Sequence, residues 1–436
     1  MAGGTWLYQN KVRPGVYINF ESEPQTIGAL GERGIATMAL LMSWGPSKEV
    51  IEIEAGENVK EKLGFNLADN ELLLIRECLK RAKKLLLYRL NIGTKATASL
   101  DTMIVTAKYG GQRGNNLSVV VQANIDDQTK YDVRTFLDGT EVSLQTVSEI
   151  SELESDWVIF SGTALKETAG LTLTGGTDGV VTNQDHTDYL NAIEVYEFNA
   201  IGLTSTDETL KSLYTSFTKR LREEEGYKIQ LIVTNFPTAD SEAVISVKNG
   251  VVLSDGTKLS PSEAVAWVTG ATAGANVNES LTYQAYDDAV DVVPRYTNSQ
   301  IIAALKNGEF VFTLNNGKVI VEQDINTLKS FTPKKSKQFS KNRVVRVLDE
   351  IGNGLKRIFD DFYIGKVDNN ADGRNLLKNE CNSFMGTLQG INAIQNFDSQ
   401  NDVSVIKGSD SDSVYAEVYA QPVDSIEKIY MKVISA

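Results

Sequence analysis

The chain has 436 residues and a formal net charge of −14, with 42% hydrophobic and 23% charged residues. This acidic balance argues against general nucleic-acid binding, which needs a basic surface, while the apolar content is enough for several globular domains. The longest apolar run, Ile35 to Trp44, is much shorter than the roughly 20 residues of a membrane-spanning helix. The N-terminal sequence lacks the basic-then-apolar order of a secretory signal, so neither Sec-type export nor membrane insertion is expected.

The first quarter of the chain predicts one strand and one small α+β unit. A strand is expected in VYINF, residues 16–20, because the turn-forming sequence RPG precedes it and a proline follows it. The residues before this strand are polar and have no evident pairing partner. From Asp69 to Lys84, apolar residues recur at helical spacing and lead into the strand sequence LLLYRL. We therefore expect a small α+β unit over residues 25–97.

The middle of the chain predicts a β-sandwich followed by an α/β domain. Short β runs dominate residues 98–177, and the Asp-Gly pair at 138–139 is typical of a hairpin turn. Helical and strand patterns then alternate up to residue 330, which indicates a layer of parallel strands covered by helices. Within it, Ser260 and Glu263 have the spacing of a capping box at a helix start.

The last hundred residues begin with a basic segment, residues 331–366, that has nine basic and four acidic side chains. A long helix is predicted there, weakened in its middle by Gly352 and Gly354, and a second helix over about 375–389. Three β runs follow, and the last of them, EKIYMKVIS, predicts a terminal strand. The expected divisions are an N-terminal linker arm and strand (1–24), the α+β unit (25–97), the β-sandwich (98–177), the α/β domain (178–330), a C-terminal α+β domain (331–425) and a C-terminal linker strand (426–436).

Catalytic and metal-binding patterns are sparse. His186 is the single histidine, and no nucleophile motif surrounds Cys78 or Cys381, so we expect a capping or solvated histidine and two core thiols. The sequence DNNADG at 368–373 matches the first six positions of a calcium-binding EF-hand loop. Asn379 occupies the twelfth position, where that loop needs a glutamate, so a polar turn is the preferred interpretation. No catalytic residue, metal or cofactor is expected.

Both ends of the chain are predicted to be extended segments with little nearby sequence to pair with. Such a strand is an aggregation hazard unless the edge of another sheet completes it. Strand addition between subunits uses backbone hydrogen bonds for strength, and a heterologous contact of this kind can propagate into rings or helical filaments. We therefore expect a structural subunit that polymerises with its own copies. The residues expected to link subunits are Val16, Tyr17, Ile18, Phe20, Ile429, Tyr430, Met431 and Val433.

Two other functional classes stay open. An α/β hydrolase or nucleotide-dependent enzyme with a β-sandwich accessory domain is the main alternative, although the chain shows no triad and no phosphate-binding loop. Another self-assembling component, such as a surface-layer protein, has the same physical requirements.

Five sequence segments in the same order resemble contractile phage tail sheath proteins, particularly those of defective prophages and phage-tail-like bacteriocins of Gram-positive bacteria. These segments span almost the whole chain, and each is weakly specific alone. They are RPGVYINFES, AKYGGQRGNNLSVVV, LTGGTDG with HTDYLNAIEVYEFNAIGL, FYIGKVDNNADGRNLL and PVDSIEKIYMKV.

The resemblance implies a subtilisin-like α/β domain with an inserted β-sandwich, an α+β C-terminal domain and extended terminal strands. It also implies hexameric rings stacked helically around an inner tail tube, with baseplate and tail terminator proteins as further partners. Contraction would then drive the tube through a bacterial envelope. Such a protein assembles in the cytoplasm and ends in a virion tail or in a tail-like particle released by lysis. It has no direct nucleic-acid partner.

In that setting, the basic segment is a candidate for contact with acidic groups on the inner tube, a hypothesis that rests on charge clustering alone. A solvated charged face is an equal alternative. The side chains concerned are Lys334, Lys335, Lys337, Lys341, Arg343 and Arg346.

Overall fold

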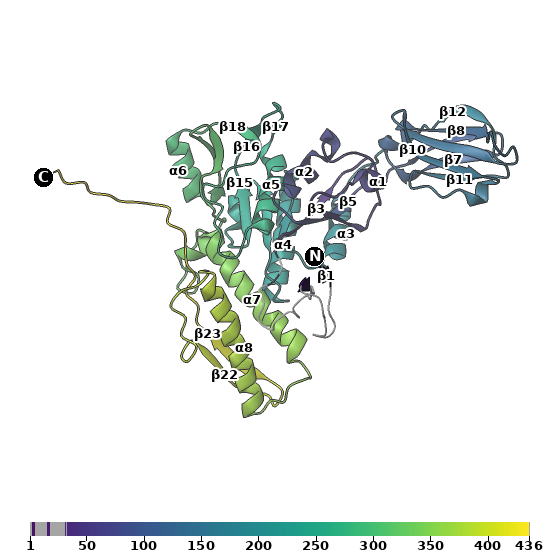
Figure 1. Ribbon diagram of the computed structural model, residues 1–436. Coiled ribbons are helices and arrows are strands. Elements are labelled where there is room, and N and C mark those ends of the chain that lie inside the picture. The colour runs from purple at the N-terminus through teal and green to yellow at the C-terminus, as the bar shows by residue number, and fades with distance from the viewer. Residues whose placement is uncertain (1, 5–14, 18–30, 32, 436) are drawn as a thin grey trace. The chain divides into compact units, whose positions relative to one another are not determined.

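The computed structural model describes residues 2–4, 15–17, 31 and 33–435, and its contacts divide the chain into two compact units (Figure 1). The central unit comprises residues 32–353 and 422–436. The C-terminal unit comprises residues 1–31 and 354–421. Among the described residues, no helix is both long and apolar enough to span a bilayer.

A seven-stranded sheet with the order β19-β15-β14-β13-β3-β5-β4 forms the centre of the central unit. Every neighbouring pair is parallel except β4 with β5, and the parallel strands are almost wholly buried, as apolar strands covered on both faces should be. The strands are β3 (Ile35–Leu40), β4 (Val50–Glu54), β5 (Lys84–Arg89), β13 (Ala200–Gly202), β14 (Gln230–Thr234), β15 (Val244–Val247) and β19 (Glu309–Phe310).

This sheet corrects the expected division at residues 25–97. Strand β3 pairs with β13, in the register Ala36 with Ala200, so the predicted α+β unit is one half of the sheet of the α/β domain. The chain leaves this sheet after β5, forms the β-sandwich and returns at β13. The sandwich is thus an insertion, as predicted. Local patterns predicted the strands correctly, but a pairing between residues more than 160 positions apart leaves no local signal.

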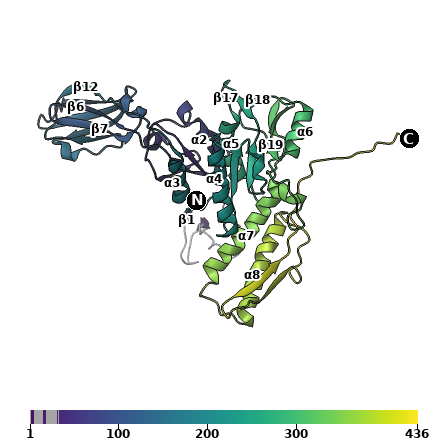
Figure 2. The ribbon, with the colours of Figure 1, turned by 180° about the vertical axis from the view of Figure 1, so that it is seen from behind.

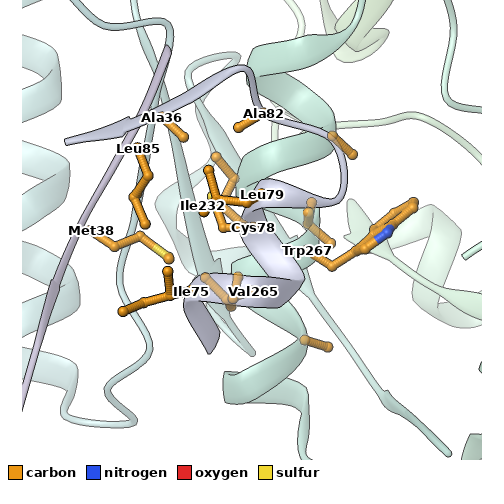
Figure 3. Packing of buried hydrophobic residues seen from close by; sticks show 14 of the residues in the cluster. Ala36, Met38, Ile75, Cys78, Leu79, Ala82, Leu85, Ile232, Val265 and Trp267 are labelled. Carbon is orange, nitrogen blue, oxygen red and sulfur yellow. The ribbon is translucent and has the colours of Figure 1, made fainter. Parts of the chain in front are cut away.

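Helices cover both faces of the sheet and bury two large apolar clusters. Figure 3 shows Met38 and Ile232 from the sheet, Ile75 and Cys78 from α2, and Val265 from α5 gathered in one of them. The helices are α1 (Lys60–Leu63), η1 (Asn70–Leu72), α2 (Leu73–Leu79), α3 (Asn183–Ile193), α4 (Glu208–Glu223), η4 (Pro237–Ala239), α5 (Pro261–Gly274) and α6 (Asn298–Lys306).

Helix starts and tight approaches follow from particular residues. The Ser260 hydroxyl accepts a hydrogen bond from the Glu263 backbone, and the Glu263 carboxylate accepts one from the Ser260 backbone, so α5 begins with the predicted capping box. Within α5, a Cβ on Gly270 would lie 2.0 Å from the carbonyl oxygen of Cys78, so only glycine lets α2 and α5 approach this closely. The predicted helix from Asp69 is shorter than expected, because α2 ends at Leu79.

Two smaller β elements complete the central unit. Strands β16, β17 and β18 form a three-stranded antiparallel sheet, and β20 pairs with β21 through the turn at Asn316, which has a φ of 50°. Their bounds are β16 (Gly250–Leu253), β17 (Lys258–Leu259), β18 (Ala289–Val293), β20 (Phe312–Asn315) and β21 (Lys318–Val321).

The inserted β-sandwich has two antiparallel sheets, β10-β9-β8-β12 and β11-β7-β6, visible from both sides in Figures 1 and 2. Asp138, with a φ of 52°, turns the predicted hairpin between β9 and β10. Trp44, which precedes the insertion, stacks on Trp157 at 5.7 Å between ring centroids and belongs to the sandwich core. The elements are β6 (Lys95–Leu100), β7 (Met103–Gly110), η2 (Gln112–Asn116), β8 (Leu117–Ala123), β9 (Tyr131–Leu137), β10 (Thr140–Val147), η3 (Ile150–Glu152), β11 (Val158–Ser161) and β12 (Thr168–Thr172).

Helix α7 (Asn342–Phe362) passes from the central unit into the C-terminal unit, where α8 (Ala371–Gly390) follows. Its first half belongs to the central unit because Asp349 accepts two hydrogen bonds of 2.7 Å from Arg222 of α4. The boundary between the two compact units therefore lies inside this helix. The helix is continuous through both glycines, and a Cβ on Gly354 would lie 2.3 Å from Cζ of Phe384. Gly354 thus serves close packing against α8.

Candidate assembly surfaces

The C-terminal arm, which we define as residues 428–435, has no strand in the structure, although EKIYMKVIS predicted one (Figure 1). A strand exists only when another backbone accepts and donates its ladder hydrogen bonds, and no described residue of the chain does so here. The arm instead exposes large apolar side chains. Relative exposure is 78% for Ile429, 92% for Tyr430, 72% for Met431 and 83% for Val433.

At the N-terminus, β2 (Gly15–Tyr17) includes the predicted linkage residues Val16 and Tyr17. The predicted residues Ile18 and Phe20 lie outside the described part of the chain. Strand β2 pairs in parallel with β1 (Ala2–Gly4), which corrects the expectation that the residues before it have no partner. This pairing was missed because the sequence AGG has neither β-branched nor aromatic residues to indicate a strand.

The C-terminal unit contains a sheet of only two described strands, β22 (Val403–Lys407) and β23 (Val414–Val418). Val403 pairs with Val418, and these side chains face α7 and α8. Ile406 and Tyr415, each 53% exposed, lie on the opposite face. Each strand has one edge with no partner among the described strands, so the hairpin can accept further strands.

A cavity of about 440 Å³ lies in the C-terminal unit beside β23. Most of its lining is apolar, and three lining residues alternate along β23 on its helix-facing side. The apolar lining residues are Leu355, Phe359, Leu377, Cys381, Val414, Ala416 and Val418. A strand added at this edge would place every second side chain toward these residues.

The basic segment divides into exposed and engaged side chains. Lys334 and Lys337 are exposed. Lys335 forms an ion pair with Glu242 at 2.5 Å, and Lys341 pairs with Glu427.

Two arginines of the basic segment, Arg343 and Arg346, lie in the first part of α7, within the central unit. Arg343 is partly buried, and burial lowers the pKa of its guanidinium. Arg346 is 1% exposed, donates to the carbonyl oxygen of Glu279 and lies 3.5 Å from Asp324, so its predicted tube-facing position is wrong. Charge clustering in the sequence could not show that this part of α7 is enclosed.

His186 is buried rather than capping or solvated, which corrects the expectation. Its Nδ1 lies 2.8 Å from the hydroxyl of Tyr214, and burial lowers its pKa. The capping role belongs to Thr182 and Asp185 at the start of α3. Burial raises the pKa of Cys381 to about 11 and that of Cys78 further, so both are core thiols, as predicted.

The first three residues of the DNNADG segment precede α8 and the last three begin that helix, so the preferred polar turn is confirmed only for residues 368–370. Asn370 caps α8 by accepting a hydrogen bond of 2.8 Å from the Gly373 backbone. Among the described residues, no group of three or more His, Cys, Asp or Glu side chains could hold a metal ion.

Comparison with known protein families matches four successive parts of the chain to phage tail sheath proteins. The matched descriptions are the domain III N-terminal region of tail sheath protein Gp18 (33–90), the β-sandwich domain (91–178), the central domain (179–327) and the C-terminal domain (334–434).

Relatives of similar length agree with these matches. Phage-like element PBSX protein XkdK of Bacillus subtilis is 37% identical over 99% of both chains. The sheath tail protein of Desulfitobacterium hafniense has a TM-score of 0.86 and 62% identity over 96% of this chain and 99% of its own. That of Listeria innocua has a TM-score of 0.82 and 42% identity over 92% of this chain and 95% of its own.

A more distant structure shares the fold. The contracted helical sheath of the anti-feeding prophage has a TM-score of 0.57 at 15% identity, over 97% of this chain and 99% of its own. The multidomain α/β architecture with a β-sandwich is therefore that of contractile sheaths, and the enzyme alternative finds no support. The chain belongs to the phage tail sheath proteins and is a structural subunit of a contractile sheath rather than an enzyme.

Proposed function

We propose that this subunit polymerises into hexameric rings stacked helically around an inner tail tube, and that contraction of this sheath drives the tube through a bacterial envelope. The observation that supports the proposal most is the C-terminal arm, whose apolar side chains are almost fully exposed. Exposing several large apolar side chains together is unfavourable in water, by about 1.5–3 kcal/mol for each side chain relative to burial. A partner that buries them would recover much of this free energy.

The alternation of side chains along the arm fits the hairpin of a second copy. In an extended strand, Ile429, Met431 and Val433 share one face, while Tyr430 and Lys432 share the other. Pairing with β23 would direct the first face into the apolar cavity beside that strand. The second face would lie beside Tyr415 and Glu417 of β23, in solvent.

The N-terminal residues Val16, Tyr17, Ile18 and Phe20 are proposed to add a strand to a neighbour in the same way. Links of this kind let subunits rotate as rigid bodies while the lattice stays connected. No cofactor is required, because the free energy for contraction can be stored in a kinetically stable assembled state.

Finer features belong to the same proposal. Baseplate and tail terminator proteins are further partners of the sheath. The exposed Lys334 and Lys337 face the inner tube. The central domain has a subtilisin-like fold without protease chemistry. The subunit assembles in the cytoplasm and becomes part of a virion tail or of a bacteriocin-like particle released by lysis.

Two truncations test the proposal, one lacking residues 1–20 and one lacking residues 428–436. Each variant is expected to remain a folded monomer that sediments as a single species, while the full chain forms ordered tubes visible by negative-stain microscopy. Ordered tubes from either truncated chain would refute the linkage at that end. Charge reversal at Lys334 and Lys337 should weaken tube-dependent assembly more at low than at high salt, because salt screens exposed charges.

A further inference from the structure

Glu427, the residue immediately before the C-terminal arm, is held firmly by the central unit. Its carboxylate accepts hydrogen bonds of 2.9 Å from the Thr282 hydroxyl and 2.7 Å from the Gln323 amide, and it pairs with the ammonium group of Lys341. Ser425 donates a further bond of 3.3 Å. The Glu427 side chain is only 11% exposed, so most of its surface is enclosed by these donors.

The donors come from separate parts of the fold. Thr282 follows α5, Gln323 follows β21, and Lys341 immediately precedes α7. The Thr282 hydroxyl also accepts a hydrogen bond of 2.9 Å from the backbone of Asp324, which places it in a fixed orientation. One carboxylate therefore joins the chain's last segment to parts of the central unit that are distant in sequence. Hydrogen bonds to a charged group are about twice as strong as neutral ones.

The residues on either side of Glu427 behave differently. Ile426 is 96% exposed. Within the described part of the chain, none of the arm residues 428–435 forms a hydrogen bond or ion pair with a residue outside the arm. The fixed part of the chain therefore ends at Glu427, and an apolar strand sequence begins directly after it.

We infer that Glu427 anchors the root of the C-terminal arm on its own subunit, so that only residues 428–435 extend toward the neighbouring copy. This inference rests on the proposed function. Eight extended residues reach at most about 29 Å. Releasing the anchor would add the preceding linker to the free segment and lower the effective concentration of the arm at the neighbour's hairpin. It would also leave Lys341 without its carboxylate partner.

Trypsin can test the anchor directly, because Lys428 and Lys432 lie within the arm. A protease needs several extended residues on both sides of the cut, and Glu427 restrains this approach at Lys428 but not at Lys432. In the full chain, cleavage after Lys432 should be the faster. Glu427→Ala should raise the ratio of cleavage after Lys428 to cleavage after Lys432 by roughly tenfold, as expected for the loss of charge-assisted hydrogen bonds.

Glu309→Ala is the matched control. Glu309 is another enclosed carboxylate of the central unit, 4% exposed, which pairs with Lys248 at 2.9 Å and accepts from Asn307. Its removal should leave the cleavage ratio unchanged. Glu427→Gln keeps the shape of the side chain and removes its charge. If Glu427→Ala fails to fold, the cleavage ratio of the glutamine variant tests the anchor instead. An unchanged ratio in a folded Glu427 variant would overturn the anchor.

The rate of polymerisation is a second test of the anchor. Glu427→Ala should polymerise at least tenfold more slowly than the full chain, and the swap of Lys341→Glu with Glu427→Lys should recover part of the rate that either single change loses. If a variant with a raised cleavage ratio polymerised at the normal rate, the role of the Glu427 anchor in assembly would be overturned. If the chain truncated at residue 427 still formed tubes, the proposed function would fail, while the cleavage ratio would still report on the anchor.

Discussion

Two strand-like segments of this protein have opposite surroundings. Strand β5, with the sequence KLLLYR, lies between β3 and β4, and its Leu87 is fully buried. The arm sequence IYMKV has similar strand propensity, yet Ile429 is 78% exposed and no described strand of the chain lies beside it. Strand propensity shows that a segment can form a strand, whereas the available pairing partner decides where that strand forms. An apolar strand sequence without an internal partner is thus the feature that points to assembly.

The largest expected effect comes from a charge on one face of the arm. Met431→Asp should abolish polymerisation, because strand addition would force a carboxylate into the apolar cavity beside β23, at a cost of several kcal/mol. Sedimentation velocity and negative-stain microscopy would measure the loss. Tyr430→Asp makes the same change of charge on the opposite, solvent-facing side and should reduce assembly far less. Equal loss in both variants would contradict the proposed orientation of the arm.

The comparison of buried and exposed strands can also be tested in the monomer. Leu87→Ala should lower the free energy of unfolding by about 3 kcal/mol, since it removes buried atoms from the centre of the sheet and leaves a cavity. Ile429→Ala should change it by less than about 0.5 kcal/mol, as is usual at exposed positions. Urea unfolding at concentrations where the protein is monomeric measures both. A large effect at Ile429 would mean that the arm packs on its own subunit.

Two glycines in α7 provide a smaller contrast within one helix. Gly354→Ala should destabilise the C-terminal unit by about 2 kcal/mol, because the new methyl group would overlap the Phe384 ring. Gly352→Ala should stabilise α7 by about 0.5–1 kcal/mol, since the nearest atom, Cγ of Lys228, is 3.4 Å away and flexible. Thermal melts would show the two signs. The same sign for both changes would contradict the packing role of Gly354.

Local sequence signals predicted the elements well and their long-range relations poorly. The capping box at Ser260 and the turn at Asp138 were both predicted, because each depends on neighbours within a few residues. The pairing of β3 with β13 was missed, and so was the burial of Arg346, because both depend on contacts with distant segments. The proposed linkage residues of the arm were predicted from a terminal β run and from the family resemblance, and the anchoring carboxylate was overlooked. The residues next to Glu427 in the sequence do not indicate that Thr282, Gln323 and Lys341 contact its carboxylate.

The smallest expected effect is the pH dependence of the arm root. Burial works against the ionised form of Glu427, but the bonds from Lys341 and Gln323 outweigh burial and lower its pKa below the ordinary 4.5. A lowered pKa in the folded state means that the anchor contributes fully above about pH 4.5 and loses its contribution as pH falls through the folded-state pKa. The hydroxyl and amide donors do not titrate.

Urea unfolding of the full chain and of Glu427→Gln at several pH values measures this change. The full chain should be the more stable protein above about pH 4.5, and the difference in the free energy of unfolding should shrink at more acidic values. The carboxylate of Asp324, whose backbone NH donates to the Thr282 hydroxyl, is present in both proteins, so the difference isolates Glu427. An equal difference at every pH would show that the contrast between a fixed root and a free arm does not depend on this charge.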